Sequence, residues 1–463
     1  MRIRVGLFFG GKSVEHEVSV ISAIQVASAM DTGKYEIIPV YITKDNEMYT
    51  GADLLIPGNY RDLPSLMARC ARVTLTRDGG KVFVTGRAGK SFAGLFARRL
   101  RYQLDVAFPV VHGTNVEDGS LQGFLQLHDL PYVGCDVGAS ASGMDKWTAK
   151  CLMLYAGLPV LPGYCLRSAS YYDAPEEAIR AIEAFHGYPL IIKPVNLGSS
   201  VGVNAARDRD ELVEGIELAA SFSERLLIEP MVTPLREINC AVLGDGDMTE
   251  ASECEEPLTT GEILSYADKY LRGGSGKSGT GGKSGAGRKS GALAKYGAPA
   301  KSGGSAKYGE SVMTGAGTVA LEPAAGDADR AGSGDRDTAA KVSLTGGAKG
   351  MESAMRVLPA VLERSMEDEI KLLARKAFSA LNCSGVARVD FLVDTDSEKV
   401  YINEINTIPG SLSFYLWEAG GKSFGQLTDE LIQLAFKRHR TQSGLIWSNS
   451  ANLLAGLPAG IKG

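Results

Sequence analysis

Apolar and polar positions in the first part of the chain follow a pattern of strands and helices. Ile3 to Phe9 is an apolar run that ends at a glycine pair, and a helical pattern follows from Val18 to Met30. A second apolar run covers Ile37 to Ile42, and a third covers Leu104 to Val111. Such runs are typical of buried parallel strands, so the pattern predicts a doubly wound α/β domain that begins with a βαβ unit.

The next part of the chain alternates helices with short strands. Helical patterns cover Lys146 to Tyr155, Pro175 to Phe185 and Asp210 to Ser221. Strand patterns cover Tyr188 to Lys193 and the apolar residues that lead to Glu229. At the end of that strand, the carboxylate of Glu229 is a candidate partner for a ribose hydroxyl or an adenine amino group.

A β-hairpin is predicted closer to the C-terminus. Val386 to Val393 and Lys399 to Ile405 are rich in β-branched and aromatic residues, and turn-forming residues separate them. Side chains alternate between the two faces of a strand. A turn centred on Ser397 therefore places Asp390 opposite Glu404.

The predicted hairpin collects polar groups on one face, because the same register places Arg388 opposite Asn406. Two neighbouring carboxylates repel each other, whereas Mg²⁺ binds hard oxygen ligands together with substrate phosphates. We therefore predict that Asp390, Glu404 and Asn406 are magnesium ligands. The alternative is a solvated hairpin face on which Arg388 pairs with the acids.

The composition is that of a globular protein with a mild negative charge. Of 463 residues, 44% are hydrophobic and 22% are charged, with a net charge of −5. This length predicts about three domains, and the charge argues against nucleic acid or an anionic membrane as a main partner. The seven cysteines lack CxxC spacing, and we find neither a signal peptide nor an apolar run of ~18 residues. We expect reduced thiols and a cytoplasmic location.

Two loops of the first domain carry candidate ligand-binding side chains. The loop GGKSVEHEVS lacks the GxGxxG dinucleotide pattern, but Glu15 places a carboxylate at a helix start, where it suits a substrate ammonium. The alternative is that Ser13 and Glu15 only cap the helix. His112 follows the third apolar run, at the sheet edge where ligands bind, and its alternative is a hydrogen bond to loop backbone.

The segment KPVNLGSSVGV predicts a phosphate-binding turn between two strands. It is not a Walker loop, because the GK[ST] helix start is absent. Backbone N–H groups of Gly198, Ser199 and Ser200 form a candidate nest for phosphate, with Lys193 and Lys146 as cations beside it. The alternative is a glycine hairpin turn whose lysine extends to solvent.

Several motifs together resemble one enzyme family. They are GGKSVEHEVS, VHGTNVEDGSLQG, MDKWTAK, KPVNLGSSVGV, IEPMV, YADKY, KGMESAMRVLPA, GVARVDF and INEINTIPG. In this order they resemble the ATP-grasp ligases, specifically the D-alanine:D-alanine ligases, from Val5 to Phe436 apart from one interruption. The resemblance implies a three-domain ATP-grasp fold with a substrate domain (1–140), a central subdomain (141–228), a catalytic subdomain (229–440) and a tail (441–463).

The resemblance also implies roles for individual residues. ATP contacts are implied for Lys146, Lys193, Glu229, Met231, Val232, Glu237 and Lys269, with Gly198, Ser199, Ser200 and Val201 over the phosphates. Two Mg²⁺ or Mn²⁺ ions are implied at Asp390, Glu404 and Asn406. D-Alanine contacts are implied for Glu15, His112, Arg388, Gly410 and Ser411. Oxyanion stabilisation is implied for Arg388 and Gly410. For Tyr270, the resemblance implies that it closes a lid over the site by contacting Ser199 and Glu15.

The implied reaction joins two D-alanines through an acyl phosphate, with cleavage of ATP, to make a peptidoglycan precursor. The resemblance also suggests a homodimer. Relatives that use D-lactate or D-serine have histidine or phenylalanine at the position of Tyr270. The tyrosine of this chain favours D-alanine as the second substrate. The alternatives are a ligase that uses D-serine or D-lactate, a non-catalytic nucleotide-binding homologue and, more distantly, a biotin-dependent carboxylase.

Two departures from the family pattern stand out. Residues 271–350 hold 21 of the 56 glycines, so we expect a disordered insertion in the lid loop, whose candidate segment is Ile263 to Gly274. After Gly410 the family places a serine that holds the second carboxylate. This chain has SLSFYLWE there, which leaves Ser411, Ser413 and Tyr415 as open alternatives. A helix over Leu427 to Phe436 is expected to close the last domain, with a free tail from Thr441.

Overall fold

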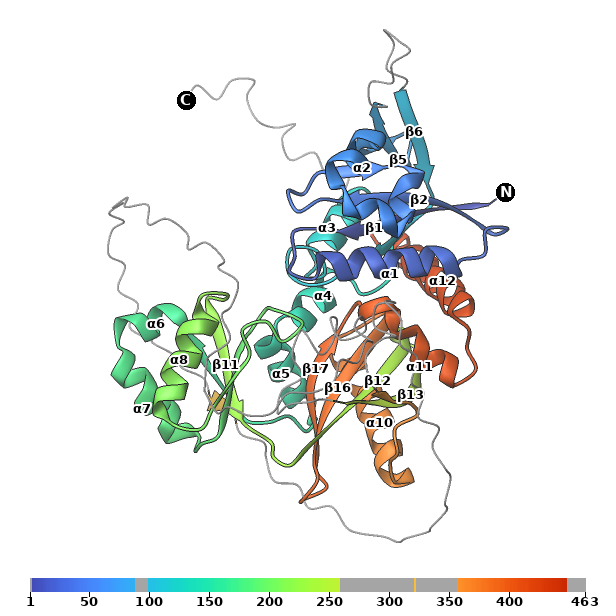
Figure 1. Ribbon diagram of the computed structural model, residues 1–463. Coiled ribbons are helices and arrows are strands. Elements are labelled where there is room, and N and C mark those ends of the chain that lie inside the picture. The colour runs from blue at the N-terminus through green and yellow to red at the C-terminus, as the bar shows by residue number, and fades with distance from the viewer. Residues whose placement is uncertain (1, 88–98, 259–319, 322–355, 448–463) are drawn as a thin grey trace, which may run out of the picture.

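The computed structural model describes residues 2–87, 99–258, 320–321 and 356–447, which form three sheets with helices around them (Figure 1). The first domain has a seven-stranded sheet in the order β6-β5-β4-β3-β2-β1-β7. Its strands are β1 (Ile3–Gly10), β2 (Tyr35–Ile42), β3 (Met48–Thr50), β4 (Ala71–Asp78), β5 (Lys81–Arg87), β6 (Arg99–Leu104) and β7 (Val106–Val110). Its helices are α1 (His16–Ala29), α2 (Leu63–Arg69) and α3 (Ser120–Leu127), with 3-10 turns η1 (Ala52–Leu55) and η2 (Pro57–Arg61).

The predicted βαβ unit is confirmed, because β1 pairs in parallel with both β2 and β7. The predicted buried parallel strand from Leu104 to Val111 is confirmed over Val106–Val110, which is β7, but its start is wrong because Leu104 is the last residue of β6. Asp105 lies at the break, where its Oδ2 accepts hydrogen bonds from the backbone N–H of Arg4 at 2.8 Å and from its Nε at 2.9 Å. This charged contact fixes the point at which the chain changes strands.

The central part of the chain forms a five-stranded antiparallel sheet in the order β10-β9-β11-β8-β14. Its strands are β8 (Gly163–Arg167), β9 (Leu190–Pro194), β10 (Asn204–Ala206), β11 (Arg225–Pro230) and β14 (Ala320–Leu321). The helices are α4 (Val137–Met144), α5 (Lys146–Tyr155), α6 (Ser168–Asp173), α7 (Pro175–Phe185) and α8 (Arg209–Ala220). The predicted limits of α5 and α7 are confirmed.

The third sheet has the order β15-β13-β12-β16-β17. Its strands are β12 (Leu235–Gly244), β13 (Thr249–Pro257), β15 (Arg356–Val357), β16 (Gly385–Asp394) and β17 (Val400–Asn406). The helices are α10 (Arg364–Ala380), α11 (Phe414–Ala419) and α12 (Phe424–Ser443), with the 3-10 turn η5 (Gly410–Ser413). Helix α10 packs on one face of this sheet (Figure 1), which leaves the other face available for a site.

Helix α12 is longer than the sequence pattern predicts. A capping box between Ser423 and Gln426 starts it before Leu427, and it continues to Ser443. The prediction of a free tail from Thr441 is therefore wrong for its first residues, and residues beyond 447 lie outside the described chain. The helix packs against α1 and β7 of the first domain (Figure 1).

The predicted hairpin register is confirmed at the positions that matter for the site. Arg388 pairs with Asn406, and Asp390 with Glu404. A register shift then follows, and Phe391 pairs with Ile402. The additional residue is Asn403, and bulges of this kind redirect a side chain.

The buried apolar residues form three cores, one for each sheet. Two segments belong to a core other than that of their predicted domain. Ala149 and Met153 of α5 pack in the core of the third sheet, and Leu427 and Leu431 of α12 pack in the core of the first. The three units are therefore joined by buried contacts that cross the predicted boundaries at 140 and 229.

The predictions for the lid and for the insertion concern mainly residues that the structure does not describe. The candidate lid Ile263 to Gly274 and nearly all of the insertion 271–350 lie outside the described residues. Within the described ranges, no helix combines the length and the apolar character that crossing a bilayer requires.

Candidate functional site

One cavity lies where the three units meet, and most of the predicted site residues line it. They are Glu15, His112, Lys146, Lys193, Gly198, Ser199, Ser200, Met231, Val232, Glu237, Arg388, Asp390, Glu404, Asn406 and Gly410. Val201, Glu229 and Ser411 are absent from this lining, although the structure describes them. Lys269 and Tyr270 lie outside the described residues. Residues up to 395 positions apart in sequence thus share one cavity, as the lining from Glu15 to Gly410 shows.

The first domain contacts the glycine turn of the central sheet through Glu15. Its side chain makes no capping hydrogen bond on α1, so the capping alternative does not describe it. Instead Ser199 Oγ donates a hydrogen bond to Glu15 Oε1. A Cβ added to Gly198 would lie 2.4 Å from Glu15 Oε2, so glycine is required for this close approach. The contact places a buried carboxylate at the end of the cavity next to the turn.

The glycine turn itself holds two residues in a strained conformation. Ser199 and Ser200 have φ angles of 53° and 56°, in the left-handed region that side chains other than glycine rarely adopt. The following strand β10 begins at Asn204, later than the predicted start near Val201. The turn is therefore longer than predicted, and strain of this kind is concentrated at ligand-binding sites.

Glu229 pairs with two lysines behind the cavity wall. Its Oε1 lies 2.5 Å from Lys150 Nζ and its Oε2 lies 2.7 Å from Lys193 Nζ. Burial alone would raise the pKa of Glu229, but the two ammonium groups lower it to about 2. Lys193 Nζ also donates to Asn403 Oδ1 at 2.9 Å, which links this cluster to the bulge of the hairpin. Glu229 thus fixes Lys193, and it also pairs with Lys150, which lies in the motif MDKWTAK but was assigned no role from the sequence.

The hairpin patch, which consists of Asp390, Glu404 and Asn406, lines the cavity and is not a solvated surface. Arg388 donates to both oxygens of Asp390, at 2.6 and 2.7 Å, as the alternative interpretation expected. Arg388 is only 8% exposed, however, so this pair is buried. Asn406 Nδ2 donates to Asp390 Oδ2 at 3.1 Å, and Lys146 Nζ lies 3.3 Å from Glu404 Oε2. Two carboxylates, one amide and two cations therefore occupy one wall.

Glu117 connects the first domain to the loop that precedes Gly410. It accepts hydrogen bonds from the backbone N–H groups of Gly113 and Ile408, both at 2.9 Å, and from Thr407 Oγ1 at 3.2 Å. Burial raises its pKa to about 7 against the effect of these donors. The contact fixes the loop from residue 407 to 410 relative to the first sheet.

His112 has a similar positioning role. Burial lowers its pKa to about 4, so the ring is neutral at pH 7. Nδ1 lies 2.9 Å from the Ile408 carbonyl oxygen, which can only accept, so Nδ1 carries the proton. Nε2 then accepts from Ser22 Oγ at 3.1 Å. Both ring nitrogens therefore bind protein groups, although His112 lines the cavity.

The candidates for the second carboxylate point away from the cavity. Ser411 donates its N–H to Ser22 Oγ at 2.9 Å and its Oγ–H to Gln25 Oε1 at 2.5 Å, both on α1. Ser413 is 0% exposed, and Tyr415 lies behind the wall. Ser411, Leu412 and Ser413 all have positive φ angles, 50°, 57° and 49°, an unusual run for residues other than glycine.

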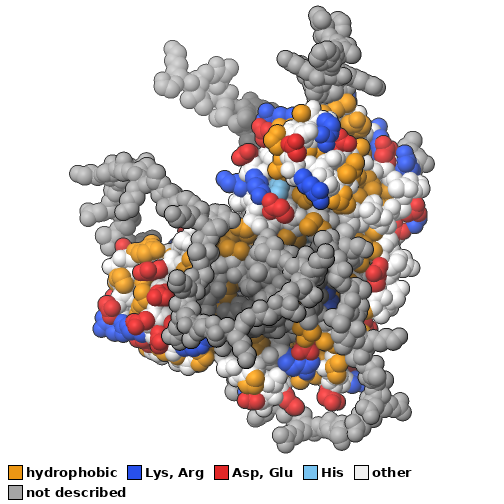
Figure 2. All heavy atoms as spheres, in the orientation of Figure 1, with side chains coloured by type: hydrophobic (Ala, Val, Ile, Leu, Met, Phe, Trp, Pro, Cys, Tyr) orange, Lys and Arg blue, Asp and Glu red, His pale blue; other side chains and the backbone are white. Residues whose placement is uncertain are grey.

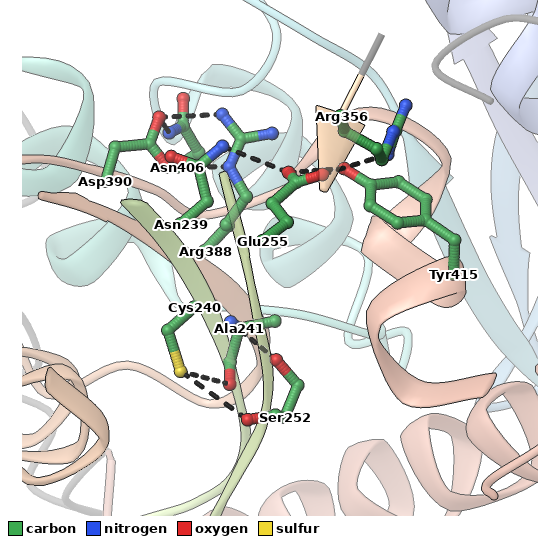
Figure 3. Close-up of polar contacts among 10 residues, drawn as sticks. All are labelled: Asn239, Cys240, Ala241, Ser252, Glu255, Arg356, Arg388, Asp390, Asn406 and Tyr415. Atoms are coloured by element: carbon green, nitrogen blue, oxygen red, sulfur yellow. Dashed lines mark hydrogen bonds and ion pairs between the residues drawn. The ribbon is translucent and has the colours of Figure 1, made fainter. Parts of the chain in front are cut away.

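A further polar cluster, the Glu255 cluster, consists of Asn239, Glu255, Arg356 and Tyr415 (Figure 3). Glu255 Oε1 accepts from Asn239 Nδ2 at 3.0 Å and from Tyr415 OH at 2.9 Å, and Oε2 lies 3.0 Å from Arg356 Nη1. The sequence assigned no role to Asn239, Glu255 or Arg356, and all three line the cavity. Its signals for this cluster were Arg356, which lies within the motif KGMESAMRVLPA, and Tyr415, among the alternatives after Gly410.

Figure 2 shows the charge distribution on one face of the described residues. Acidic and basic side chains are interspersed there, and a continuous basic area is not seen on the described part of that face. Nucleic acid binding generally uses clustered lysine and arginine. The charged groups that face the cavity instead suit small substrates of mixed charge.

Comparison with protein families identifies relatives along most of the chain. A model of the D-ala D-ala ligase N-terminus matches residues 4–135. A model of the D-ala D-ala ligase C-terminus matches residues 152–280 and 346–433. The residues between 280 and 346 therefore fall outside both models, in agreement with an insertion in this part of the chain.

Individual relatives match over nearly the whole length. A D-alanine--D-alanine ligase of Thermosipho africanus is 31% identical over 451 residues, which cover 97% of this chain and 98% of that protein. D-Alanine--D-alanine ligase A of Escherichia coli is 31% identical, with 96% and 98% covered. The solved D-alanine-D-alanine ligase of Coxiella burnetii is 26% identical, with a TM-score of 0.66 and 96% of each chain covered. The VanG D-Ala:D-Ser ligase of Enterococcus faecalis is 26% identical, with a TM-score of 0.65 and 94% and 100% covered.

Proposed function

We propose that this chain, which belongs to the D-ala D-ala ligase family, joins two D-alanines while ATP is converted to ADP and phosphate. The observation that carries the proposal is a single cavity shared by the Glu15–Ser199 contact and the hairpin patch of Asp390, Glu404 and Asn406. One part suits an amino acid ammonium, and the other suits a metal-bound triphosphate. The family implies a role in peptidoglycan synthesis, for which we propose a cytoplasmic location and a homodimer.

ATP is proposed to lie between the central and third sheets. Lys146 and Lys193 line the cavity and provide positive charge for its phosphates, with the backbone of Gly198, Ser199 and Ser200 beside them. Val201, the next residue of the turn, is proposed to contribute its backbone as well. Met231, Val232 and Glu237 line the part proposed for adenine and ribose. Lys269 of the lid segment is proposed to add a further cation. Glu229 is proposed to act indirectly, because it holds Lys193 from behind the wall.

The hairpin patch has the chemistry that magnesium requires. Asp390 and Glu404 provide carboxylate oxygens, and Asn406, whose Nδ2 is bonded to Asp390, provides an amide oxygen. Two Mg²⁺ ions, or Mn²⁺, held by these residues would neutralise charge on the triphosphate. Among the described residues, no group of three or more His, Cys, Asp or Glu side chains forms a separate metal site. A site with two carboxylates agrees with metal binding that also uses substrate phosphates.

The first step activates a carboxylate. An oxygen of the first D-alanine attacks the γ-phosphorus, the bond to the β-phosphate oxygen breaks, and ADP leaves. Glu15 is proposed to hold the ammonium of this substrate, because its carboxylate lines the cavity beside the glycine turn. Tyr270 is proposed to complete the closure with Ser199 and Glu15, which excludes water from the acyl phosphate.

The second step forms the peptide bond. The amine nitrogen of the second D-alanine attacks the acyl carbon, the bond to the phosphate oxygen breaks, and the amine loses a proton. Arg388 and the Gly410 N–H are proposed to stabilise the negative oxygen of the tetrahedral intermediate. The Asp390 carboxylate fixes the Arg388 guanidinium and contributes to an Arg388 pKa well above the usual value, so this charge is permanent.

The test is a product analysis. The purified chain is incubated with ATP, Mg²⁺ and equal concentrations of D-alanine, D-serine and D-lactate, and ADP and condensation products are quantified by mass spectrometry. The expected result is one D-alanyl-D-alanine for each ADP, with little mixed product. A predominance of D-alanyl-D-serine or D-alanyl-D-lactate would assign a different second substrate. ADP formation that does not depend on D-alanine would contradict the proposal.

A further inference from the structure

The second D-alanine brings a carboxylate that is not consumed in the reaction. A charge that leaves water needs a partner in the cavity, because an unpaired buried carboxylate is strongly disfavoured. The inference below rests on the proposed function, and it concerns the residue that binds this second carboxylate.

The described lining of the cavity contains four lysine and arginine side chains, Lys146, Lys193, Arg356 and Arg388. Three of them lie among the groups proposed for ATP, metal or the reacting carbon. Lys146 lies beside Glu404, Lys193 beside Glu229, and Arg388 makes a bidentate contact with Asp390. Arg356 is the member of this set that pairs with Glu255 in the Glu255 cluster, on strand β15 at the far edge of the same sheet from the hairpin (Figure 3).

The serines that follow Gly410 do not provide this contact. Ser411 directs its hydroxyl to Gln25 on α1, and Ser413 is fully buried. To reach a substrate, the Ser411 hydroxyl would have to break its hydrogen bond to Gln25, and the Ser413 hydroxyl would have to leave its buried position. The carboxylate must therefore be recognised by another group of this chain.

We propose that Arg356 binds the carboxylate of the second D-alanine. Its guanidinium carbon lies 4.0 Å from the centre of the Tyr415 ring, and its Nη1 lies 3.0 Å from Glu255 Oε2. A guanidinium has five N–H donors in a planar fork, so contacts with Glu255 and Tyr415 are compatible with a further contact to a substrate carboxylate. The Arg356 side chain is 11% exposed and lines the cavity, which gives the substrate access.

The other members of the Glu255 cluster act as positioning residues. Asn239 and Tyr415 both donate to Glu255 Oε1, which directs Oε2 toward Arg356. Glu255 lies between Arg356 and Arg388 (Figure 3) and adds to the factors that raise the pKa of Arg388. One carboxylate thus separates the guanidinium proposed for the second carboxylate from the guanidinium proposed for the oxyanion.

The test uses D-alaninamide, which lacks a carboxylate to phosphorylate and can serve only as the second substrate. D-Alanine and D-alaninamide compete as acceptors, and the two dipeptide products are quantified by mass spectrometry. In Arg356→Met, the preference for D-alanine over D-alaninamide should fall roughly 10- to 100-fold, as expected for loss of a charged hydrogen bond. The Michaelis constant for the first D-alanine should change less than about twofold, and Arg356→Lys should restore part of the preference.

Arg236→Met is the matched control. It removes an arginine–glutamate pair of the same sheet, Arg236 on β12 with Glu256 on β13, at positions that do not line the cavity. Its acceptor preference should equal that of the wild type. If Arg356→Met is unstable because Glu255 loses its partner, the double variant with Glu255→Gln replaces it in the same comparison.

An unchanged acceptor preference in the folded Met variant would overturn the inference and leave the proposed function intact. Absence of any dipeptide with the wild-type chain would overturn the proposed function, and the inference with it. A fall in preference in both Arg356→Met and Arg236→Met would also contradict the inference, because it would indicate a general effect of pair loss.

Discussion

Two regions of the third sheet line the cavity and are built from contacts of very different range. In the hairpin of β16 and β17, Asn406 and Asp390 are 16 positions apart. Further along the same sheet, Glu255 contacts Arg356 across 101 positions and Tyr415 across 160. One turn organises the hairpin, whereas the Glu255 cluster exists only after strands β12, β13 and β15 and helix α11 have assembled. A site can therefore combine a locally determined half with a half that depends on the whole fold.

The functions proposed for the two regions follow the same division. The hairpin collects acids and an amide, which suit the metal ions and phosphates that an ATP-dependent reaction of this type requires. The Glu255 cluster holds one arginine against one glutamate, and this suits recognition of a particular amino acid. Four substitutions test the comparison, in order of decreasing expected effect.

Asp390→Asn should have the largest effect, because it removes a carboxylate from the proposed metal site and leaves the buried Arg388 without its charged partner. We expect kcat for dipeptide formation to fall by roughly 10²- to 10³-fold. Steady-state ADP release measures it, and unfolding by denaturant reports the accompanying loss of stability. Asp394→Asn, half-buried at the end of the same strand and outside the cavity lining, is the control and should retain activity. Equal activity of the two variants would remove Asp390 from the metal site.

Glu229→Gln should mainly affect stability. The pKa of Glu229 is lowered from 4.5 to about 2 in the fold, so the charged form stabilises the native state by about 3 kcal/mol above pH 4.5. This contribution is lost as the pH falls from 4.5 toward 2, because both states then bind the proton. The difference in free energy of unfolding between wild type and variant should therefore be largest at pH 7 and decrease below pH 4.5.

Denaturant unfolding at several pH values measures this difference. The exposed Glu224, next to the same strand, provides the control Glu224→Gln, for which we expect a change within about 0.5 kcal/mol. A difference between wild type and Glu229→Gln that stays constant from pH 7 to pH 3 would show that the two lysines do not lower the Glu229 pKa.

Gly198→Ala tests the close contact between the first domain and the glycine turn. The added Cβ would lie 2.4 Å from Glu15 Oε2, so the carboxylate or the turn must move. We expect the Michaelis constant for the first D-alanine to rise about tenfold, since a shift of this size costs roughly 1.4 kcal/mol of positioning. Gly187→Ala, where nothing lies within 4 Å of the added Cβ, is the control. A Michaelis constant of Gly198→Ala equal to that of the wild type would contradict the proposal that Glu15 holds the substrate ammonium.

Ser411→Ala should have the smallest effect. Its hydroxyl contacts Gln25 and its amide contacts Ser22, so the substitution removes one internal hydrogen bond worth about 1 kcal/mol. Both D-alanine Michaelis constants should stay within about twofold of the wild type. A rise of tenfold or more in the constant for the second D-alanine would return Ser411 to the acceptor site and weaken the assignment of Arg356.

The sequence predicted the elements with strong local patterns. The register of Asp390 with Glu404 followed from alternation and a central turn, and the structure confirms it. The strand predicted from Leu104 to Val111 begins too early, because one charged residue, Asp105, separates Leu104 of β6 from the buried parallel strand β7. Helix α12 was too short in the prediction because its last turns are amphipathic and partly exposed, and the first domain holds it in place.

Site residues divide in the same way. Motif residues such as Glu15, Lys193 and Asp390 line the cavity, as predicted for a ligand site. Lys150 and Glu255 could not be found, because each acquires its meaning from a partner in a distant segment, Glu229 in one case and Arg356 in the other. The position of Glu229 at a strand end suggests exposure and so predicts a contact with the nucleotide. The fold instead buries Glu229 between Lys150 and Lys193.

The central claim is that one cavity activates a D-alanine carboxylate as an acyl phosphate and then couples it to a second D-alanine. The most direct measurement uses D-alanine with ¹⁸O in both carboxylate oxygens. The activated carboxylate gives one oxygen to phosphorus, so each D-alanyl-D-alanine formed should be accompanied by one inorganic phosphate that carries one ¹⁸O atom. Phosphate without label, released in equal amount to the dipeptide, would contradict the account.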